Sequence, residues 1–262
     1  MNPKTKMQKK QYEWEWQWNN ARNDSKWLFT EWIYPNNLED FRGKEVLDCG
    51  CGGGQHLNLI APYCKAAVGV DLNSGSIARR NNRHNRNIKI MEGDIAKINL
   101  GKKFDTVYSI GVLHHTDNPT ASFNNIAKHA KKRGKVIVWV YSFEGNLLNR
   151  VFLESFKKIF FFWINKKILW IFSNFITGAL YVPIFTVYLL PLRFLPFYEY
   201  FQNFRKLSFK ENNLNVFDKL NAPQTFFIKK SVVGMWFNPK KFRDVHISPY
   251  RGVSWRASGT KK

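Results

Sequence analysis

The sequence EVLDCGCGGGQH at residues 45–56 decides the fold of this 262-residue chain. Val46 and Leu47 read as a short buried strand, and glycines follow at positions 50, 52, 53 and 54. Glycine lacks a Cβ, so the backbone can turn sharply at these positions and come close to a ligand. A strand, a glycine turn and a helix in this order are typical of a ligand-binding βαβ unit. The stretch therefore predicts an α/β fold with a ligand beside the turn.

The residues around the turn distinguish between two ligand classes, dinucleotides and S-adenosylmethionine. The dinucleotide fingerprint G-x-G-x-x-G/A requires Gly or Ala at position 55, where this chain has Gln55. Asp48 lies just before the glycines, where a carboxylate would repel a pyrophosphate but attract a cationic amino group. The pattern therefore favours a cationic ligand over a dinucleotide.

Strand-like and helix-like segments alternate from residue 45 to about residue 142. We expect strands at Glu45–Cys49, Ala66–Asp71, Ile88–Glu92, Phe104–Ile110 and Lys135–Tyr141, and helices at Gln55–Pro62, Ser74–Arg83 and Asn118–Lys131. Asn73 and Ser74 are expected to cap the second helix, and Pro119 suits the first turn of the third. This alternation predicts a parallel sheet with helices on both faces.

Acidic residues follow three consecutive predicted strands. Asp48 belongs to the first, and Asp71 ends the second, 21 residues after Gly50. A carboxylate at that distance can accept both hydroxyls of a ribose. After the third strand, Asp94 could accept a hydrogen bond from an adenine amine while Ile95 packs on the ring. Each position alone is a weak signal, but the three together predict a nucleoside site.

These motifs resemble those of class I S-adenosylmethionine-dependent methyltransferases, in the group of small-molecule enzymes that includes the ubiquinone/menaquinone type. LDCGCGGG, VGVD, EGDI and FDTVYSIGVLHHT match four successive motifs of that family, and the likeness covers residues 45–142. The resemblance implies a Rossmann-like, seven-stranded, mostly parallel sheet with an antiparallel last strand, and S-adenosylmethionine as cofactor. Carried over position by position, it implies a cofactor site made of Asp48, Gly50, Gly52, Gly54, Asp71, Leu72, Asp94, Ile95 and Ile110.

His114 and His115 are the candidate catalytic residues. They follow the fourth strand, at the carboxyl edge where open α/β sheets bind substrates. Either could take a hydroxyl proton near neutral pH, although both could instead be structural and bond loop carbonyls. Alignment alone can carry methyl transfer, so a base is not obligatory. No cluster of metal ligands stands out, and no metal is expected.

Residues 143–225 are dense in aromatic and aliphatic side chains, and Ile168–Leu192 contains no charged residue over 25 positions. Hydropathy alone makes this a transmembrane candidate. We expect the tail to return to the sheet, with a helix at Ser231–Phe237 and strands at Asp244–Ile247 and Gly252–Ala257. Both ends of the insertion would then lie on one side of any membrane, which excludes a single span. A soluble helical lid is favoured over helices that contact a membrane.

The chain is thus expected to comprise an aromatic N-terminal arm (1–44), a cofactor-binding core (45–142), an apolar helical insertion (143–225) and a C-terminal part that completes the sheet (226–262). In the arm, Tyr12, Trp14, Trp16, Trp18, Trp27 and Trp32 either pack against the sheet edge, which is slightly favoured, or cover a cofactor. The first residues are polar and basic and contain no signal peptide. We therefore expect a cytoplasmic protein, with peripheral attachment to the inner face of the membrane as the alternative.

The net charge of +22 favours anionic partners, although the basic residues are scattered and genomic base composition explains them equally well. The sequence predicts O-methylation of a small-molecule, saccharide or lipid-linked acceptor, with an anionic membrane surface as a further candidate partner. A nucleic-acid methyltransferase is less favoured, because no Asn/Asp-Pro-Pro-aromatic run follows the fourth strand and no RNA-binding motif is visible. A non-catalytic membrane-surface module that keeps the cofactor-binding fold is the third alternative.

Overall fold

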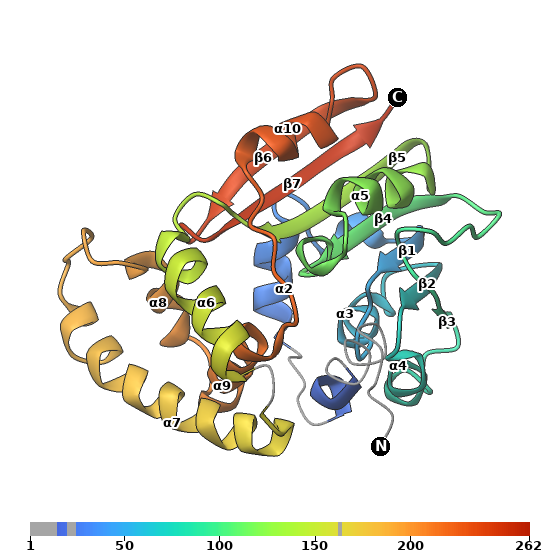
Figure 1. Ribbon diagram of the computed structural model, residues 1–262. Helices are drawn as coiled ribbons and strands as arrows, with labels where there is room; N and C mark the ends of the chain where they lie inside the picture. Colours follow the sequence, from blue (N-terminus) through green and yellow to red (C-terminus); the bar gives the residue numbers. More distant parts are fainter. Residues whose placement is uncertain (1–14, 20–24, 162–163) are drawn as a thin grey trace.

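A seven-stranded sheet forms the centre of the molecule (Figure 1). The computed structural model describes residues 15–19, 25–161 and 164–262. The strand order is β3-β2-β1-β4-β5-β7-β6, in which β1 to β5 run parallel and β7 runs antiparallel to both of its neighbours. The strands are β1 (Glu45–Cys49), β2 (Ala66–Asp71), β3 (Ile88–Glu92), β4 (Phe104–Ile110), β5 (Ala130–Tyr141), β6 (Phe242–Tyr250) and β7 (Ser254–Lys261). The predicted fold class is confirmed.

Helices cover both faces of the sheet. One face packs against α5 (Pro119–Lys128) and α10 (Lys230–Trp236) through a core that contains Phe123 and Trp236. The other face packs against α2 (Lys26–Ile33), α3 (Gln55–Ile60) and α4 (Gly75–Asn81), through a core that contains Phe29 and Leu57. Short 3-10 turns lie at η1 (Leu38–Phe41) and η2 (Leu113–His115). The buried residues of the central strands β1, β4 and β5 are divided between these two cores, so the centre of the sheet is buried on both sides.

The first four strands coincide with the prediction, whereas the fifth begins earlier. Ala130 already pairs with Phe104, ahead of a register shift, and Arg133 takes a φ of 64° inside the strand. The predicted helix Asn118–Lys131 accordingly ends at Lys128. The three consecutive charged residues at 131–133 do not resemble a buried strand, so the sequence pattern did not predict this part of β5. Lys131 is held there by ion pairs with Glu45 (3.1 Å) and Asp105 (3.0 Å).

Two further local expectations need correction. Ser74 stands at the N-cap of α4, but its side chain makes no capping hydrogen bond. The carboxylate of Asp71 instead accepts hydrogen bonds from the backbone N–H groups of Asn73 (3.2 Å) and Ser74 (3.1 Å). Strand β6 extends beyond both predicted ends, whereas β7 begins two residues later than predicted, at Ser254, and continues beyond the predicted end, because the two strands pair as far as Phe242 and Lys261. Pro119 does occupy the first turn of α5, as predicted.

The insertion between β5 and β6 forms a helical part with a core of its own. Its elements are η3 (Asn149–Leu153), α6 (Glu154–Phe156), η4 (Lys157–Phe161), α7 (Lys166–Ile184), η5 (Val187–Leu189), α8 (Tyr198–Phe204) and α9 (Phe209–Asn221). α7 packs against α9, and Leu169, Ile184, Phe204 and Phe217 are buried between them. Figure 1 shows this helical part beside the sheet, with α7 along its outer edge.

Among the residues that the structure describes, α7 is the one helix whose length and composition would suffice to cross a membrane. Only 22% of its most apolar window is buried in the protein.

Candidate active site

The glycine turn after β1 has the backbone geometry that only glycine adopts freely. Gly50, Gly52 and Gly54 have φ values of 90°, 52° and 77°. A Cβ at Gly50 would overlap the side chain of Val112, and one at Gly54 would overlap Asn82. Any side chain at these positions would be strained and crowded. The turn is therefore built for close packing against its neighbours and for close approach of a ligand.

Asp48 and Asp71 flank this turn. Asp71 accepts a hydrogen bond from the backbone N–H of Gly52 at 2.9 Å, which ties the end of β2 to the turn. Asp48 is buried, and its Oδ2 accepts a hydrogen bond from the hydroxyl of Tyr108 at 2.9 Å. Burial raises the pKa of Asp48 to about 8, and the nearby charge of Asp71 adds to this effect. A cationic group beside Asp48 would stabilise its ionised form.

This arrangement fits S-adenosylmethionine. The ligand has a cationic amino group for the buried carboxylate of Asp48. Its ribose hydroxyls can donate to the carboxylate of Asp71, which keeps about one lone-pair site beyond the three that backbone N–H groups use. At Gly52 the absence of a side chain already allows close packing, because the ring of Trp18 lies 2.7 Å from where a Cβ would stand.

The other predicted cofactor residues lie at the same edge but in different surroundings. Leu72 is 40% exposed next to Asp71, and Asp94 accepts a hydrogen bond from the N–H of Ala96 at 2.8 Å. Ile95 and Ile110 are buried in the cores on opposite faces of the sheet. Asp48, Asp71 and the glycines thus lie together at the turn. The two isoleucines lie apart from each other, on opposite faces of the sheet. The roles of all these residues toward a cofactor remain predictions.

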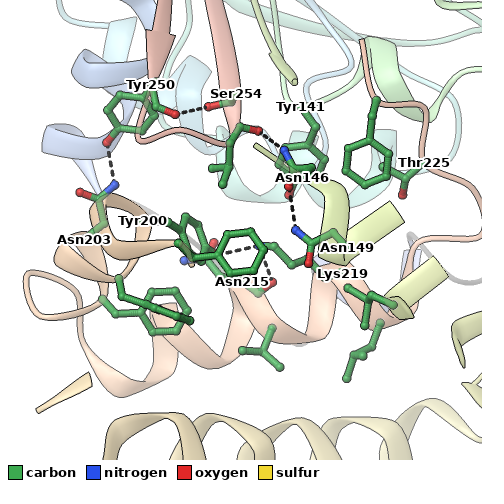
Figure 2. Close-up of a pocket in the computed structure, with 18 of the residues that line it drawn as sticks. Tyr141, Asn146, Asn149, Tyr200, Asn203, Asn215, Lys219, Thr225, Tyr250 and Ser254 are labelled. Atoms are coloured by element: carbon green, nitrogen blue, oxygen red, sulfur yellow. Dashed lines mark hydrogen bonds between the residues drawn. The ribbon is translucent and has the colours of Figure 1, made fainter. Parts of the chain in front are cut away.

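A cavity of about 280 Å³ lies between the carboxyl end of β5 and the helical insertion (Figure 2). Most of its lining is aromatic or aliphatic and comes from α2, β5, α7, α8 and α9. Its polar lining consists of His115, Tyr141, Asn146, Asn149, Glu154, Tyr200, Asn203, Asn215, Lys219, Thr225, Tyr250 and Ser254. Val112, which packs on Gly50, precedes His115 by three residues. The glycine turn does not line the cavity itself, but Trp32 of the cavity wall lies 5.9 Å, between ring centroids, from His56 at the start of α3.

The two candidate histidines occupy different positions. His115 lines the cavity, and its Nδ1 lies 2.8 Å from the carbonyl oxygen of Gln224. Because a carbonyl only accepts, Nδ1 carries the proton and Nε2 is the basic nitrogen of the neutral ring. His114 lies behind it, fully buried against the ring of Tyr141, and no hydrogen-bond partner for its ring nitrogens is found in the described part of the chain. Burial lowers the pKa of both rings, so both are neutral near pH 7.

Lys219 supplies a cation to the cavity wall. Its ammonium group donates a hydrogen bond to the hydroxyl of Tyr200 at 2.6 Å, as Figure 2 shows. Burial opposes its charge, but the surrounding tyrosines and the carboxylate of Asp218 outweigh burial and raise the pKa of Lys219. Lys219 is not among the residues that the sequence pattern pointed to. Its signal was weak, because α9 reads as an ordinary amphipathic helix and only the fold shows that Lys219 points into a cavity.

The helical turn at residues 15–19 of the N-terminal arm connects the two halves of the site. The ring of Trp18 lies against the glycine turn, 2.7 Å from where a Cβ of Gly52 would stand. On the insertion side, the amide of Gln17 donates a hydrogen bond to Asp218 at 2.8 Å. Trp16 packs on Phe217 of α9, with ring centroids 5.1 Å apart.

The aromatic residues of the arm therefore do not share one environment. Trp32 stacks near Trp139 of β5, and the ammonium group of Lys206 lies over the ring of Trp27. The favoured expectation, packing against the sheet edge, does not describe Trp16 or Trp18. Tyr12 and Trp14 lie outside the described residues.

The core of the chain matches known proteins. Residues 47–138 match the protein family described as "Methyltransferase domain". This match and the fold together support an S-adenosylmethionine-dependent methyltransferase core in residues 47–138. The matched residues include the glycine turn, Asp71, Asp94 and both histidines, but neither the insertion nor the C-terminal strands. The match does not distinguish the subgroup that includes ubiquinone-type enzymes from the other subgroups.

Curated relatives match only about half of this chain. The tRNA U34 carboxymethyltransferase of Haemophilus influenzae is 26% identical over 132 residues, 48% of this chain and 40% of that protein. The putative methyltransferase 235L of Invertebrate iridescent virus 6 is 32% identical over 130 residues, 47% of this chain and 48% of that protein. The match thus spans less than half the length of these relatives.

A solved structure resembles the chain along nearly its whole length. The N-methyltransferase NodS from Bradyrhizobium japonicum, in complex with S-adenosyl-L-homocysteine, covers 97% of this chain with a TM-score of 0.52 at 10% identity. The covered part is 98% of that protein. At this identity the likeness establishes the fold alone.

Proposed function

We propose that this protein transfers a methyl group from S-adenosylmethionine to an oxygen atom of a small, largely apolar acceptor that binds in the cavity beside the glycine turn. The observation that carries the proposal is the position of this cavity. It lies at the carboxyl end of β5, on the same edge of the sheet as the glycine turn, and is lined by the helical insertion. Pockets that take small ligands are usually apolar with a few fixed polar groups, which matches this lining.

The polar groups of the cavity suit an oxygen nucleophile. Methyl transfer from a sulfonium is an in-line displacement, and a hydroxyl must lose its proton as the new bond forms. His115 is neutral and presents a basic Nε2 on the ring side opposite Gln224, so we assign it as the residue that takes this proton. The ammonium group of Lys219 would stabilise the negative charge that develops on the acceptor oxygen, or hold an anionic group of the acceptor.

Cofactor binding is the first step to test, by calorimetric titration of S-adenosylmethionine into the wild type and an Asp71→Ala variant. The variant loses both the predicted contacts to the ribose and the hydrogen bond to Gly52 that holds the turn. Hydrogen bonds to charged groups contribute about 1.5–3 kcal/mol each, so binding should weaken at least about tenfold. A folded wild-type protein that does not bind S-adenosylmethionine would rule out the proposal.

A nucleic-acid acceptor is the second candidate. It is supported by the likeness to a tRNA U34 carboxymethyltransferase and by the net charge of +22. The largely apolar, enclosed cavity favours a small acceptor instead, since RNA recognition relies on exposed basic and stacking surfaces. Radiolabelled methyl transfer to total tRNA, compared with transfer to a lipid and small-metabolite extract, separates the two. Label in the tRNA fraction alone would support the second candidate and refute the first.

A further inference from the structure

The longest helix of the insertion, α7, presents an apolar face to the outside of the molecule. Ile168, Ile171, Phe175 and Val182 are 59%, 57%, 72% and 68% exposed, although each is a side chain that proteins normally bury. Their spacing of three, four and seven residues places them on one side of the helix. Large apolar faces of this kind on a protein surface mark sites of interaction.

The inner side of α7 is apolar as well, so the exposed apolar face is additional to the face that packs on the protein. Leu169 and Ile184 are fully buried in the core of the insertion, beside two buried hydroxyl residues, Ser173 and Thr177. A helix on the surface of a protein in water normally has a polar outer face, and a helix that is apolar all round is normally buried. The outer face of α7 therefore indicates an apolar environment outside the protein.

The length and chemistry of the outer face fit a lipid surface better than a protein. No charged side chain occurs between Ile168 and Leu192, whereas protein interfaces are on average no more apolar than the rest of a protein surface. Exposed basic residues stand at both ends of this run. Lys167 lies four residues before Ile171 on the same side of the helix, and Arg193 follows the run directly. With the net charge of +22, this pattern complements anionic lipid headgroups.

Packing excludes a transmembrane position for α7 in this fold. Leu169 and Ile184, near its two ends, are fully buried in the core that the helix shares with α8 and α9. A helix fixed along its whole length to the protein can only lie in the plane of the membrane interface, with its free face in the lipid.

We propose that α7 docks this protein on the surface of an anionic lipid bilayer through Ile168, Ile171, Phe175 and Val182. The proposal does not depend on methyl transfer, and it places the cavity close to the lipid. Ile176 and Leu180, on the inner side of α7, belong to the cavity wall. An amphiphilic acceptor in the bilayer would then be separated from the cavity by this one helix.

The test is co-sedimentation of the full chain with vesicles of phosphatidylcholine that contain 30% phosphatidylglycerol, and with vesicles of phosphatidylcholine alone. We expect binding to the anionic vesicles that persists in part at 0.5 M salt, because the apolar contribution is not screened. The double variant Phe175→Gln/Val182→Gln should weaken this salt-resistant binding about tenfold or more. Met235→Gln is the matched control, since Met235 is 66% exposed on α10 and should leave binding unchanged.

A second variant tests the proposal even if the double variant fails to fold. Lys167 is exposed, so Lys167→Glu should keep the fold but weaken binding to anionic vesicles at low salt. Each variant is checked for folding by its binding of S-adenosylmethionine. If the wild type does not bind this ligand, an unchanged thermal transition is the check. The proposal is overturned if the wild type does not bind anionic vesicles, or if the double variant and the Met235 control bind equally. It is also overturned if light scattering shows a vesicle-free dimer that the double variant dissociates, which would make the face a protein interface.

Discussion

Changing the pH tests whether the buried carboxylate of Asp48 holds the cofactor. Burial raises its pKa to about 8, so the carboxyl group is about 90% protonated at pH 7 before a ligand binds. The amino group of S-adenosylmethionine has a pKa of about 8 and stays cationic below pH 7. This cation pairs with the ionised carboxylate only. Cofactor binding should therefore release a proton from Asp48.

The magnitude follows from the ionised fraction. An apparent Kd equals the intrinsic Kd divided by the fraction of protein in the competent state. With a pKa of about 8, the ionised fraction falls about tenfold from pH 7 to pH 6, so the apparent Kd should rise about tenfold. Lower pH thus weakens binding. At pH 7 about 0.9 proton should be released per cofactor bound.

Isothermal titration between pH 5.5 and pH 7, in two buffers with different ionisation enthalpies, measures both quantities. Asp48→Asn should abolish the pH dependence and the proton release, and should bind about as weakly as the wild type does at pH 5.5. His56 does not interfere, because burial lowers its pKa to about 4. The reasoning is refuted if the wild-type Kd is constant over this range, or if Asp48→Asn keeps the same slope.

Two further predictions concern the base and the core of the insertion. His115→Asn should lower kcat about 10²–10⁴-fold for the acceptor found by screening, with unchanged affinity for S-adenosylmethionine, because the proton acceptor is lost while the glycine turn is untouched. An unchanged kcat in a turnover assay would show that His115 is not the base and has a structural role. Phe217→Ala should lower the free energy of unfolding by about 3–5 kcal/mol, because Phe217 is fully buried against Trp16 and Trp170. Denaturant titration should show less than about 0.5 kcal/mol for Phe194→Ala, a phenylalanine that is 80% exposed.

Local patterns located most of the sheet because each strand of the core is short, apolar and bounded by a turn. The first four strands therefore matched the prediction residue by residue. The fifth did not, because its early residues are charged, and Lys131 is held in the strand by ion pairs with Glu45 and Asp105, which lie far away in the sequence. Pairing between remote segments is invisible to a local pattern. The same limit applied to β6, where Pro249 is tolerated because the strand lies at the sheet edge.

The sequence by itself determined the class of fold and the residues of the glycine turn, because βαβ units and tight turns depend on neighbours along the chain. It also pointed to Asp48 and Asp71, whose positions at strand ends follow from that order. Tertiary structure alone decided which histidine faces the cavity, that Lys219 from α9 belongs to its wall, and that α7 turns an apolar side outward. These features depend on how segments more than 200 residues apart pack together, as Gln17 and Asp218 do at a separation of 201 residues. A sequence pattern gives the period of a helix, but packing decides which side of it meets the protein.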